Sequence, residues 1–356
     1  MNNHTLLVCG RSIGPENLDV LRSFRERFIR EDLADFLAEW YADEPTVTVQ
    51  TSGSTGAPKI MHVEKERMRA SARMTCSFLG LAPGDRALLC MPLRYIGAKM
   101  VVVRALEYGL DLYCAEPSGH ALHGLDRAPD FLAMTPAQVF SSLENADEAE
   151  KLRETRHLII GGGAVNADLA RILKDFPHAV WSTYGMTETL SHIALRRLSG
   201  PDASDWYSPF EGVSLRLTED SALAISAPAV CAEEIVTNDL AVLDEKGRFR
   251  ILGRRDNIIN SGGIKIQIEE VEEKLRSVMP CPFQITAAPD AHYGEVVVML
   301  TEEKREDWSP FFAGLHRYAR PKHVFTVSGL PLTGSGKPDR AAAKALARKL
   351  TETSHV

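Results

Sequence analysis

A nine-residue segment rich in hydroxyl groups follows a short apolar run and ends on a lysine. It reads Thr51-Ser52-Gly53-Ser54-Thr55-Gly56-Ala57-Pro58-Lys59. Glycine lets backbone N–H groups approach an anion, and serine and threonine hydroxyls add donors without adding charge. The segment therefore suits phosphate binding, although its composition is also typical of a flexible polar turn. It is not a Walker A loop, because Lys59 follows a proline and no Ser or Thr comes next to hold Mg²⁺.

Four further segments combine glycine with residues that could bind a nucleotide. Alone, each is also explained by a polar turn or, for Tyr184, a core aromatic residue. In chain order they are Gly161-Gly162-Gly163-Ala164, Tyr184-Gly185-Met186-Thr187-Glu188-Thr189, Gly253 to Ile266, and Thr333 to Arg340. Together with 51–59, they resemble in order the motifs of the adenylate-forming superfamily of acyl- and aryl-CoA ligases, adenylation domains and luciferases.

The resemblance implies an ATP and Mg²⁺ site. Tyr184 lies against adenine, Thr187 contacts the α-phosphate, and Glu188 holds Mg²⁺, a hard cation that prefers carboxylate and phosphate oxygens. Asp239 and Arg254 bind the ribose, and Gly185 belongs to the Tyr184 motif. The β- and γ-phosphates are held by Thr51, Ser52, Gly53, Ser54, Thr55, Gly56 and Lys59, and adenine is lined by Gly162, Gly163 and Ala164.

The resemblance also implies two half-reactions. Lys337 bridges the attacking carboxylate and the α-phosphate, so it is expected to be catalytic together with Thr187 and Glu188. Asp256 is the residue about which a small domain pivots. The Gly262–Gly263 loop then replaces Lys337 and admits the thiol of coenzyme A, the co-substrate.

The identity of the acid follows from a narrower resemblance. The run Ala87 to Leu106 is most similar to o-succinylbenzoate–CoA ligases of menaquinone biosynthesis. Such an acid has two carboxylates, so the one that does not react needs a cation or hydroxyl donors. Arg94, Lys99 and Ser208 are the candidates, each equally explained by a surface charge or a turn. Tyr95 stands about where many relatives carry a histidine, which leaves the details of the acyl pocket open.

The elements expected around these motifs are those of an α/β protein. Helical stretches at about 64–79, 97–108, 136–145 and 166–174 alternate with short apolar runs, which predicts a largely parallel sheet covered by helices. Residues 16–43 also have helical spacing. Short strands follow from about 191, and then a compact α+β set with helices at 268–277, 309–319 and from 339.

We expect two domains. Residues 1–253 form a large adenylation domain that is N-terminally shortened relative to most members of the superfamily. Residues 254–356 form a small mobile domain that carries the hinge, the thiol-step loop and the lysine.

Composition and net charge argue against several other classes of function. A net charge of -7 disfavours a general nucleic-acid binder, and no apolar run is long enough for a membrane span. Six scattered cysteines and no signal peptide predict a reduced cytoplasmic protein. His120 and His123 beside Glu116 could suggest a metal site, but loop histidines at this spacing are usually unrelated to metal.

Other functions remain open beside the predicted one. Within the ligase class, these are another acyl- or aryl-CoA ligase and an enzyme that loads a carrier protein. A non-catalytic nucleotide-binding regulator would be expected to lack Lys337 or Glu188, and both are present. Homo-oligomerisation also remains open.

Overall fold

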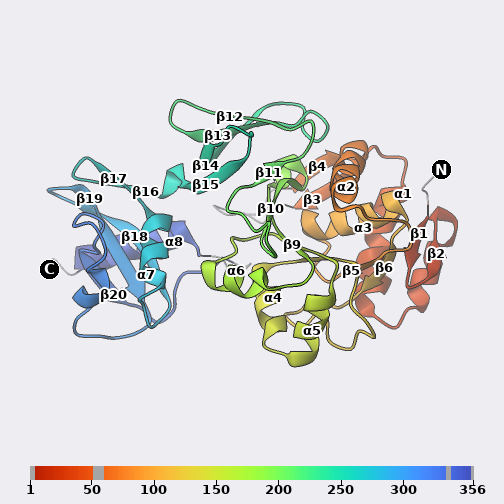
Figure 1. Ribbon diagram of the computed structural model, residues 1–356, viewed down its shortest axis with the longest axis horizontal. Coiled ribbons are helices and arrows are strands. Elements are labelled where there is room, and N and C mark those ends of the chain that lie inside the picture. The colour runs from red at the N-terminus through yellow and green to blue at the C-terminus, as the bar shows by residue number, and fades with distance from the viewer. Residues whose placement is uncertain (1–4, 51–59, 334–337, 354–356) are drawn as a thin grey trace.

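The computed structural model describes residues 5–50, 60–333 and 338–353, and its strands form three sheets and a separate hairpin (Figure 1). The predicted phosphate segment 51–59 and Lys337 lie outside the described residues. The hairpin on either side of that segment pairs β3 (Thr46–Gln50) with β4 (Ile60–Glu64).

The largest sheet has nine strands in the order β11-β10-β9-β8-β7-β5-β6-β1-β2. Neighbouring strands from β9 across to β1 are parallel, whereas β10 and β11 at one edge and β2 at the other are antiparallel. The strands are β1 Leu6–Val8, β2 Arg11–Ile13, β5 Arg86–Leu89, β6 Asp111–Cys114, β7 Phe131–Met134, β8 His157–Ile160, β9 Ala179–Gly185, β10 His192–Arg197 and β11 Ser208–Pro209.

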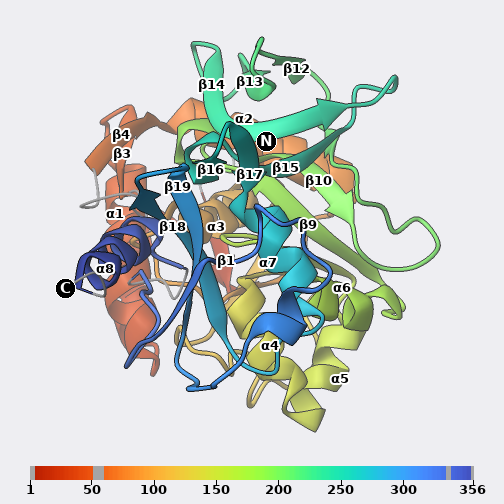
Figure 2. The ribbon, with the colours of Figure 1, turned by 90° about the vertical axis from the view of Figure 1, so that its left-hand side faces the viewer.

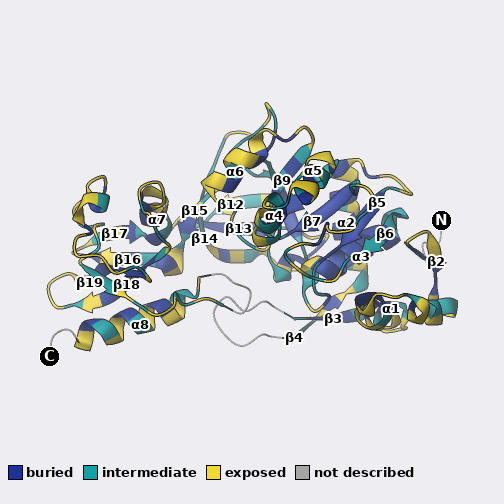
Figure 3. Cartoon of the chain, turned by 90° about the horizontal axis from the view of Figure 1, so that it is seen from below, coloured by how far each residue is buried: buried dark blue, intermediate teal, exposed yellow. Residues whose placement is uncertain are grey.

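Helices cover both faces of this sheet, as expected for parallel strands. Successive strand residues point to opposite faces, so Leu89 packs in the cluster with α2 and α3, whereas Leu88 packs with α4, α5 and α6. Figure 3 shows the burial concentrated in the central strands. The helices are α2 Lys65–Leu79, α3 Ile96–Tyr108, α4 Pro136–Leu143, α5 Ala146–Glu154 and α6 Ala167–Lys174. These positions confirm the predicted α/β class.

The succession of short strands predicted after residue 191 forms a four-stranded antiparallel sheet. It consists of β12 (Ser214–Leu217), β13 (Ala222–Ser226), β14 (Ile235–Leu243) and β15 (Phe249–Arg254). The turn between β14 and β15 is closed by a 3.0 Å hydrogen bond from the N–H of Gly247 to the carbonyl of Asp244.

The chain then enters a smaller five-stranded sheet with a helix on each face (Figure 2). Val271 and Leu275 of α7 pack on one face, and Ala343 and Ala347 of α8 pack on the other. A partly buried ion pair of 2.6 Å between Arg340 and Glu272 joins the two helices. The elements are β16 Ile258–Ser261, β17 Ile264–Gln267, α7 Ile268–Arg276, β18 Phe283–Asp290, β19 Gly294–Thr301, β20 His323–Thr326 and α8 Arg340–Thr353.

Two predicted helices were wrong in extent. Residues 16–43 contain a 3₁₀ segment η1 (Pro15–Ser23), a π-turn η2 (Ile29–Leu33) and only then α1 (Ala34–Tyr41). Asn17 interrupts the first, because its side chain bonds to Ser12 and Gly14 while its own backbone is non-helical.

The predicted helix 309–319 is a 3₁₀ turn, η5 (Ser309–Phe312). Beyond it the Arg320 side chain donates to the carbonyls of Ala313 and Leu315, and Gly314 disfavours further helix. In the described part of the chain, none of the helices combines the length and the apolar composition needed to cross a membrane.

Candidate active site

The predicted nucleotide residues follow the carboxyl ends of two neighbouring parallel strands. Gly161–Gly163 follow β8, and Gly185–Thr189 end and follow β9. In open α/β sheets ligands bind at this edge. A Cβ on Gly161 would lie 2.6 Å from Oγ1 of Thr183, and Gly162 has φ +75°. The backbone can lie this close to β9 at Gly161 because glycine has no Cβ, and the left-handed conformation at Gly162 also favours glycine.

Tyr184 and Asp239 meet at this edge. The Tyr184 hydroxyl donates a 2.6 Å hydrogen bond to Oδ2 of Asp239 on β14. The Tyr184 ring packs edge-on against Phe249, with 4.9 Å between the ring centroids. Burial, and then the negative charge of Asp239, raises the pKa of the Tyr184 phenol. The phenol therefore stays protonated and acts as a donor.

Arg254 completes the group from β15, directly across from Asp239 in the strand register. Its Nη1 lies 3.5 Å from Oδ1 of Asp239, and its Nε and Nη2 each donate to Asp256 at 2.9 Å. The hydrogen bonds from Arg254 hold the pKa of Asp256 below its ordinary value. Gln267, next to α7, donates to the Arg254 carbonyl at 2.9 Å. The predicted ribose residues and the predicted pivot thus form one charged network.

The turn that carries Thr187 and Glu188 is tightly constrained. It is a single 3₁₀ turn (Thr187–Thr189), closed by the buried Thr189 hydroxyl, which bonds to Met186 and Ser191. A Cβ on Gly185 would lie 2.3 Å from the carbonyl oxygen of Ser191, so only glycine fits there. Glu188 is exposed on this turn, which begins three residues after Tyr184 in the sequence. An exposed carboxylate next to a nucleotide site is a suitable Mg²⁺ ligand.

Comparison with known proteins identifies the family. Residues 20–224 match the family described as AMP-binding enzyme. The chain belongs to that family. An acyl-CoA synthetase (AMP-forming)/AMP-acid ligase II-like protein from Dyadobacter fermentans is 32% identical, with a TM-score of 0.64, and the match covers 93% of this chain and 97% of that one. The predicted superfamily and the predicted enzyme class, an AMP-forming acid–CoA ligase, are confirmed.

Curated relatives of this AMP-binding enzyme include 2-succinylbenzoate–CoA ligases. The protein from Geobacillus sp. is 25% identical over 369 residues, which cover 93% of this chain and 75% of the relative. The protein from Bacillus thuringiensis is 27% identical, with 89% and 73% covered. A Bacillus subtilis o-succinylbenzoate–CoA synthetase in complex with OSB-AMP shares the fold, with a TM-score of 0.70 at 23% identity.

The residues predicted for the second carboxylate have different surroundings in this AMP-binding enzyme. Lys99 is buried on α3, 3.5 Å from the carboxylate of Glu39, so its charge already has a partner. Arg94 is exposed and lies over the ring of Tyr95, the residue that caps α3. Ser208 lies on the edge strand β11, opposite Leu195.

Gly262 and Gly263 form the turn between β16 and β17 of the small sheet.

Arg104, on the buried helix α3, was not predicted as a site residue. Its side chain is buried, and none of the ion pairs among the described residues includes it. No opposite charge therefore offsets the cost of burying the guanidinium. Nη2 donates to Ser191 Oγ at 2.7 Å and to Thr75 Oγ1 at 3.3 Å, and the buried Nε lacks a hydrogen-bond partner. Burial lowers the pKa of Arg104 to about 10. A single arginine inside the apolar run 100–106 was the signal available in the sequence.

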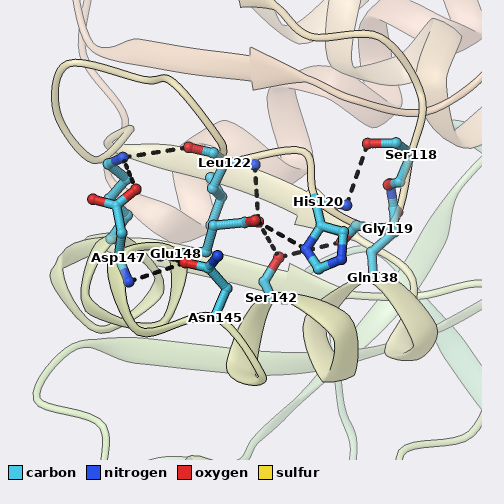
Figure 4. A network of polar contacts seen from close by, with 10 residues as sticks. Ser118, Gly119, His120, Leu122, Gln138, Ser142, Asn145, Asp147 and Glu148 are labelled. Carbon is cyan, nitrogen blue, oxygen red and sulfur yellow. Dashed lines mark hydrogen bonds and ion pairs between the residues drawn. The ribbon is translucent and has the colours of Figure 1, made fainter.

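Of the two histidines considered for a metal, His120 belongs to a hydrogen-bond network around Glu148 (Figure 4). His120 Nδ1 lies 3.0 Å from Oε1 of the buried Glu148, whose Oε2 accepts from Ser142 Oγ at 2.9 Å and from the Leu122 N–H at 3.3 Å. Within the described ranges there is no group of three or more His, Cys, Asp or Glu residues that could hold a metal. The network instead fastens the loop after β6 to α4 and α5.

Proposed function

We propose that this enzyme converts o-succinylbenzoate into its coenzyme A thioester in two steps, in the cytoplasm. A carboxylate oxygen of the acid bonds to the α-phosphorus of ATP, and pyrophosphate leaves. The sulfur of coenzyme A then bonds to the acyl carbon, its proton passes to solvent, and AMP leaves. The 2-succinylbenzoate–CoA ligases that align over most of this chain support the acid, and the AMP-binding family supports the adenylate.

The residues proposed to bind ATP fall into two groups. Asp239 would accept the ribose hydroxyls, with Arg254 beside it and Tyr184 against the adenine. Carboxylates accept several hydrogen bonds at once, so the bond from Tyr184 leaves acceptor capacity on Asp239. The adenine edge would be lined by Gly162, Gly163, Ala164 and Gly185, and the phosphates would be held by Thr51, Ser52, Gly53, Ser54, Thr55, Gly56 and Lys59.

The residues proposed to act on the reacting phosphate are Thr187, Glu188 and Lys337. The Thr187 hydroxyl would donate to the α-phosphate, and Lys337 would stabilise the charge that grows on it during attack. Glu188 would hold Mg²⁺, which neutralises phosphate charge when bound. We place the domain boundary between Gly253 and Arg254, with Asp256 as the pivot and Gly262–Gly263 as the loop of the thiol step.

The observation that carries the choice of acid is the unpaired guanidinium of Arg104. A buried cation without a counter-charge is unfavourable, and a ligand carboxylate would supply that charge. Ser191 Oγ and Thr75 Oγ1 accept hydrogen bonds from the same guanidinium, and the Ser191 hydroxyl could donate one to the ligand. Ser191 also lies two residues beyond the turn of Thr187 and Glu188, which links the acid site to the phosphate site. An acid with a second carboxylate is therefore favoured over a simple aromatic acid.

Pyrophosphate release tests the proposal directly. The enzyme is incubated with ATP, Mg²⁺ and a panel of acids that includes o-succinylbenzoate, with and without coenzyme A. We expect release with that acid and a thioester only when coenzyme A is added. Release with a different acid would keep the ligase class and reject this substrate. ATP binding without release for any acid would favour a non-catalytic role.

A further inference from the structure

We propose that His192 is a positioning residue, which fixes the guanidinium of Arg104 for the second carboxylate of the acid. It acts through two hydroxyl groups, those of Thr75 and Ser191. The inference rests on the proposed function, because it takes Arg104 as the partner of that carboxylate. We call Thr75, Arg104, Ser191 and His192 the Arg104 cluster.

The Arg104 cluster lies in the apolar core between the large sheet and its helices. Thr75 is on α2 and Arg104 on α3, two helices that lie side by side, and His192 begins β10 (Figure 1). All three are buried, and the ring of Phe210 packs 5.5 Å from the His192 ring. Buried polar groups need hydrogen-bond partners, and here they find them in one another. The bonds inside the cluster therefore decide where each polar atom points.

The backbone before β10 brings two neighbouring side chains to the same cluster. In a regular strand, consecutive side chains point to opposite faces. Leu190, just before Ser191, has φ +64°, in the left-handed region that favours glycine, and the pairing of β10 shifts register between His192 and Ala194. A strained residue of this kind persists where the surrounding contacts hold it, often at a functional site. The strained turn presents both Ser191 and His192 to the Arg104 cluster.

The hydrogen bonds of Thr75 assign the two nitrogens of His192. Burial, and then the charge of Arg104, keeps the pKa of His192 well below its ordinary value, so the ring is neutral at pH 7 and donates from one nitrogen only. Thr75 Oγ1 lies 3.2 Å from the carbonyl of Ser71, which can only accept, so the single hydroxyl hydrogen points there. The same oxygen then accepts from His192 Nε2 at 3.0 Å. Nδ1 is left as the acceptor.

This assignment fixes one corner of the guanidinium. His192 Nδ1 accepts from the Ser191 hydroxyl at 3.3 Å, so the Ser191 oxygen faces Arg104 with a lone pair. Nη2 of Arg104 donates to Ser191 at 2.7 Å and to Thr75 at 3.3 Å, which uses both of its hydrogens. The buried Nε lacks a partner among the described residues, so its N–H is left for a ligand carboxylate. Because the bond from Ser191 to His192 is long, that hydroxyl can turn to the same carboxylate.

The kinetic test compares o-succinylbenzoate with a monocarboxylic aromatic acid. His192→Phe keeps a ring and removes both nitrogens. We expect kcat/KM for o-succinylbenzoate to fall about tenfold or more, mainly through KM, because the guanidinium loses its fixed position. The value for the monocarboxylic acid and the KM for ATP should stay at the wild-type level. His192→Gln should restore most of the loss, since its amide nitrogen can donate to Thr75 as Nε2 does.

Two further variants make the kinetic result decisive. Thr75→Val removes one hydroxyl at nearly equal volume and should give the same selective loss. His157→Phe is the matched control, because His157 is a half-buried histidine at the start of β8, outside the Arg104 cluster. A wild-type preference between the two acids in His192→Phe and Thr75→Val, or equal losses for both acids, would overturn the proposal.

A measurement without any acid separates this proposal from the proposed function. The Nε–H of Arg104 is followed by ¹⁵N NMR in the full chain, with Arg104→Met to identify the signal. We expect its hydrogen to exchange with water about tenfold faster or more in His192→Phe, and at the wild-type rate in His192→Gln and His157→Phe. An unchanged rate in His192→Phe would reject the positioning role even where the thioester forms. A faster rate in His192→Phe that His192→Gln restores, without any thioester from o-succinylbenzoate, would keep the positioning role and reject the proposed acid.

Discussion

The hydroxyl of Tyr184 and the carboxylate of Asp239 are joined by a 2.6 Å hydrogen bond between β9 and β14. The bond links the large parallel sheet to the four-stranded antiparallel sheet. Arg254 approaches the other oxygen of the same carboxylate, at 3.5 Å. Asp239 is thus held in position from two sides, by a phenol and a guanidinium that both donate hydrogen bonds to it. A carboxylate fixed in this way is oriented before the nucleotide arrives.

Asp239→Ala tests the role of that carboxylate in ATP binding. Hydrogen bonds to a charged group contribute about 1.5–3 kcal/mol, so kcat/KM for ATP should fall by about 10- to 150-fold. Pyrophosphate exchange at varied ATP concentrations measures the change. Asp168→Ala, on the exposed first turn of α6, is the control and should leave the value unaltered. A normal kcat/KM for ATP in Asp239→Ala would contradict the assignment.

Arg104→Met tests whether the buried guanidinium selects a dicarboxylic acid. Loss of a charged pair with the ligand should lower kcat/KM for o-succinylbenzoate by about 100-fold. The value for a monocarboxylic aromatic acid should not fall. Since methionine removes an unpaired buried charge at similar volume, the thermal unfolding midpoint should stay level or rise.

Arg94→Met and Lys99→Met are the comparison variants for this selectivity. Lys99 already pairs with Glu39, so its removal should affect stability more than the preference between acids. A collapse of the dicarboxylate preference in Lys99→Met, but not in Arg104→Met, would transfer the assignment to Lys99.

We expect the stability of the fold to depend on pH through His192. Burial, and then the charge of Arg104, keeps the pKa of His192 well below its ordinary value. The folded state therefore binds fewer protons than the unfolded state, and stability falls as the pH drops below the unfolded pKa of about 6.5. For one histidine the loss is at most about 1.4 kcal/mol per pH unit. Urea unfolding at pH 7.5 and 5.5 should show a smaller pH effect in His192→Gln than in the wild type. His123→Gln, at an exposed loop position, should keep the full effect.

Three residues of the proposed nucleotide site lie close together in the sequence. Tyr184 lies on β9, and Thr187 and Glu188 lie in the turn that follows it. The runs that precede these residues are short and apolar, so the elements that carry them could be inferred from the sequence. The partner of Tyr184 lies on another sheet and was expected only from the family motif. No local pattern specifies that Asp239 faces the Tyr184 hydroxyl.

Arg104 shows what local patterns leave out. Helix α3 is buried on nearly all sides, so it has no polar stripe that would reveal where a charged residue points. The contacts that define the environment of Arg104 come from Thr75 on α2 and from Ser191 before β10, 87 positions later. Lys99 and Arg94 were equally plausible from sequence, and only the packing separates the three.

Substitution of Glu148 should lower the stability of the fold without affecting ATP binding. Glu148→Ala would leave the Ser142 hydroxyl and the Leu122 N–H without their buried acceptor. We expect a loss of about 3 kcal/mol in the free energy of unfolding, with KM for ATP unchanged. His120→Gln should cost under about 1 kcal/mol, because the histidine side of the pair is 57% exposed. Urea unfolding measures both, and equal losses would contradict the buried-acceptor explanation.

Lys337→Ala separates the two half-reactions. We expect adenylation to fall by about 1000-fold or more, since an oxyanion-stabilising group is removed. Conversion of supplied acyl-adenylate to thioester should continue. Lys344→Ala is the control, because Lys344 pairs with Glu295 on the surface of the small sheet. Equal loss of both halves in Lys337→Ala would argue against alternation between two domain positions.

The two edges of the large sheet have a consequence for self-association. An edge strand exposes unpaired backbone groups, on which a second molecule could add a strand. Here β11 has only two residues and ends in Pro209, which has no N–H to donate, and β2 has only three residues, with Arg11 exposed. Both edges therefore offer too little backbone to a second sheet, which protects a wide, apolar parallel sheet from fibre-like stacking in a crowded cell.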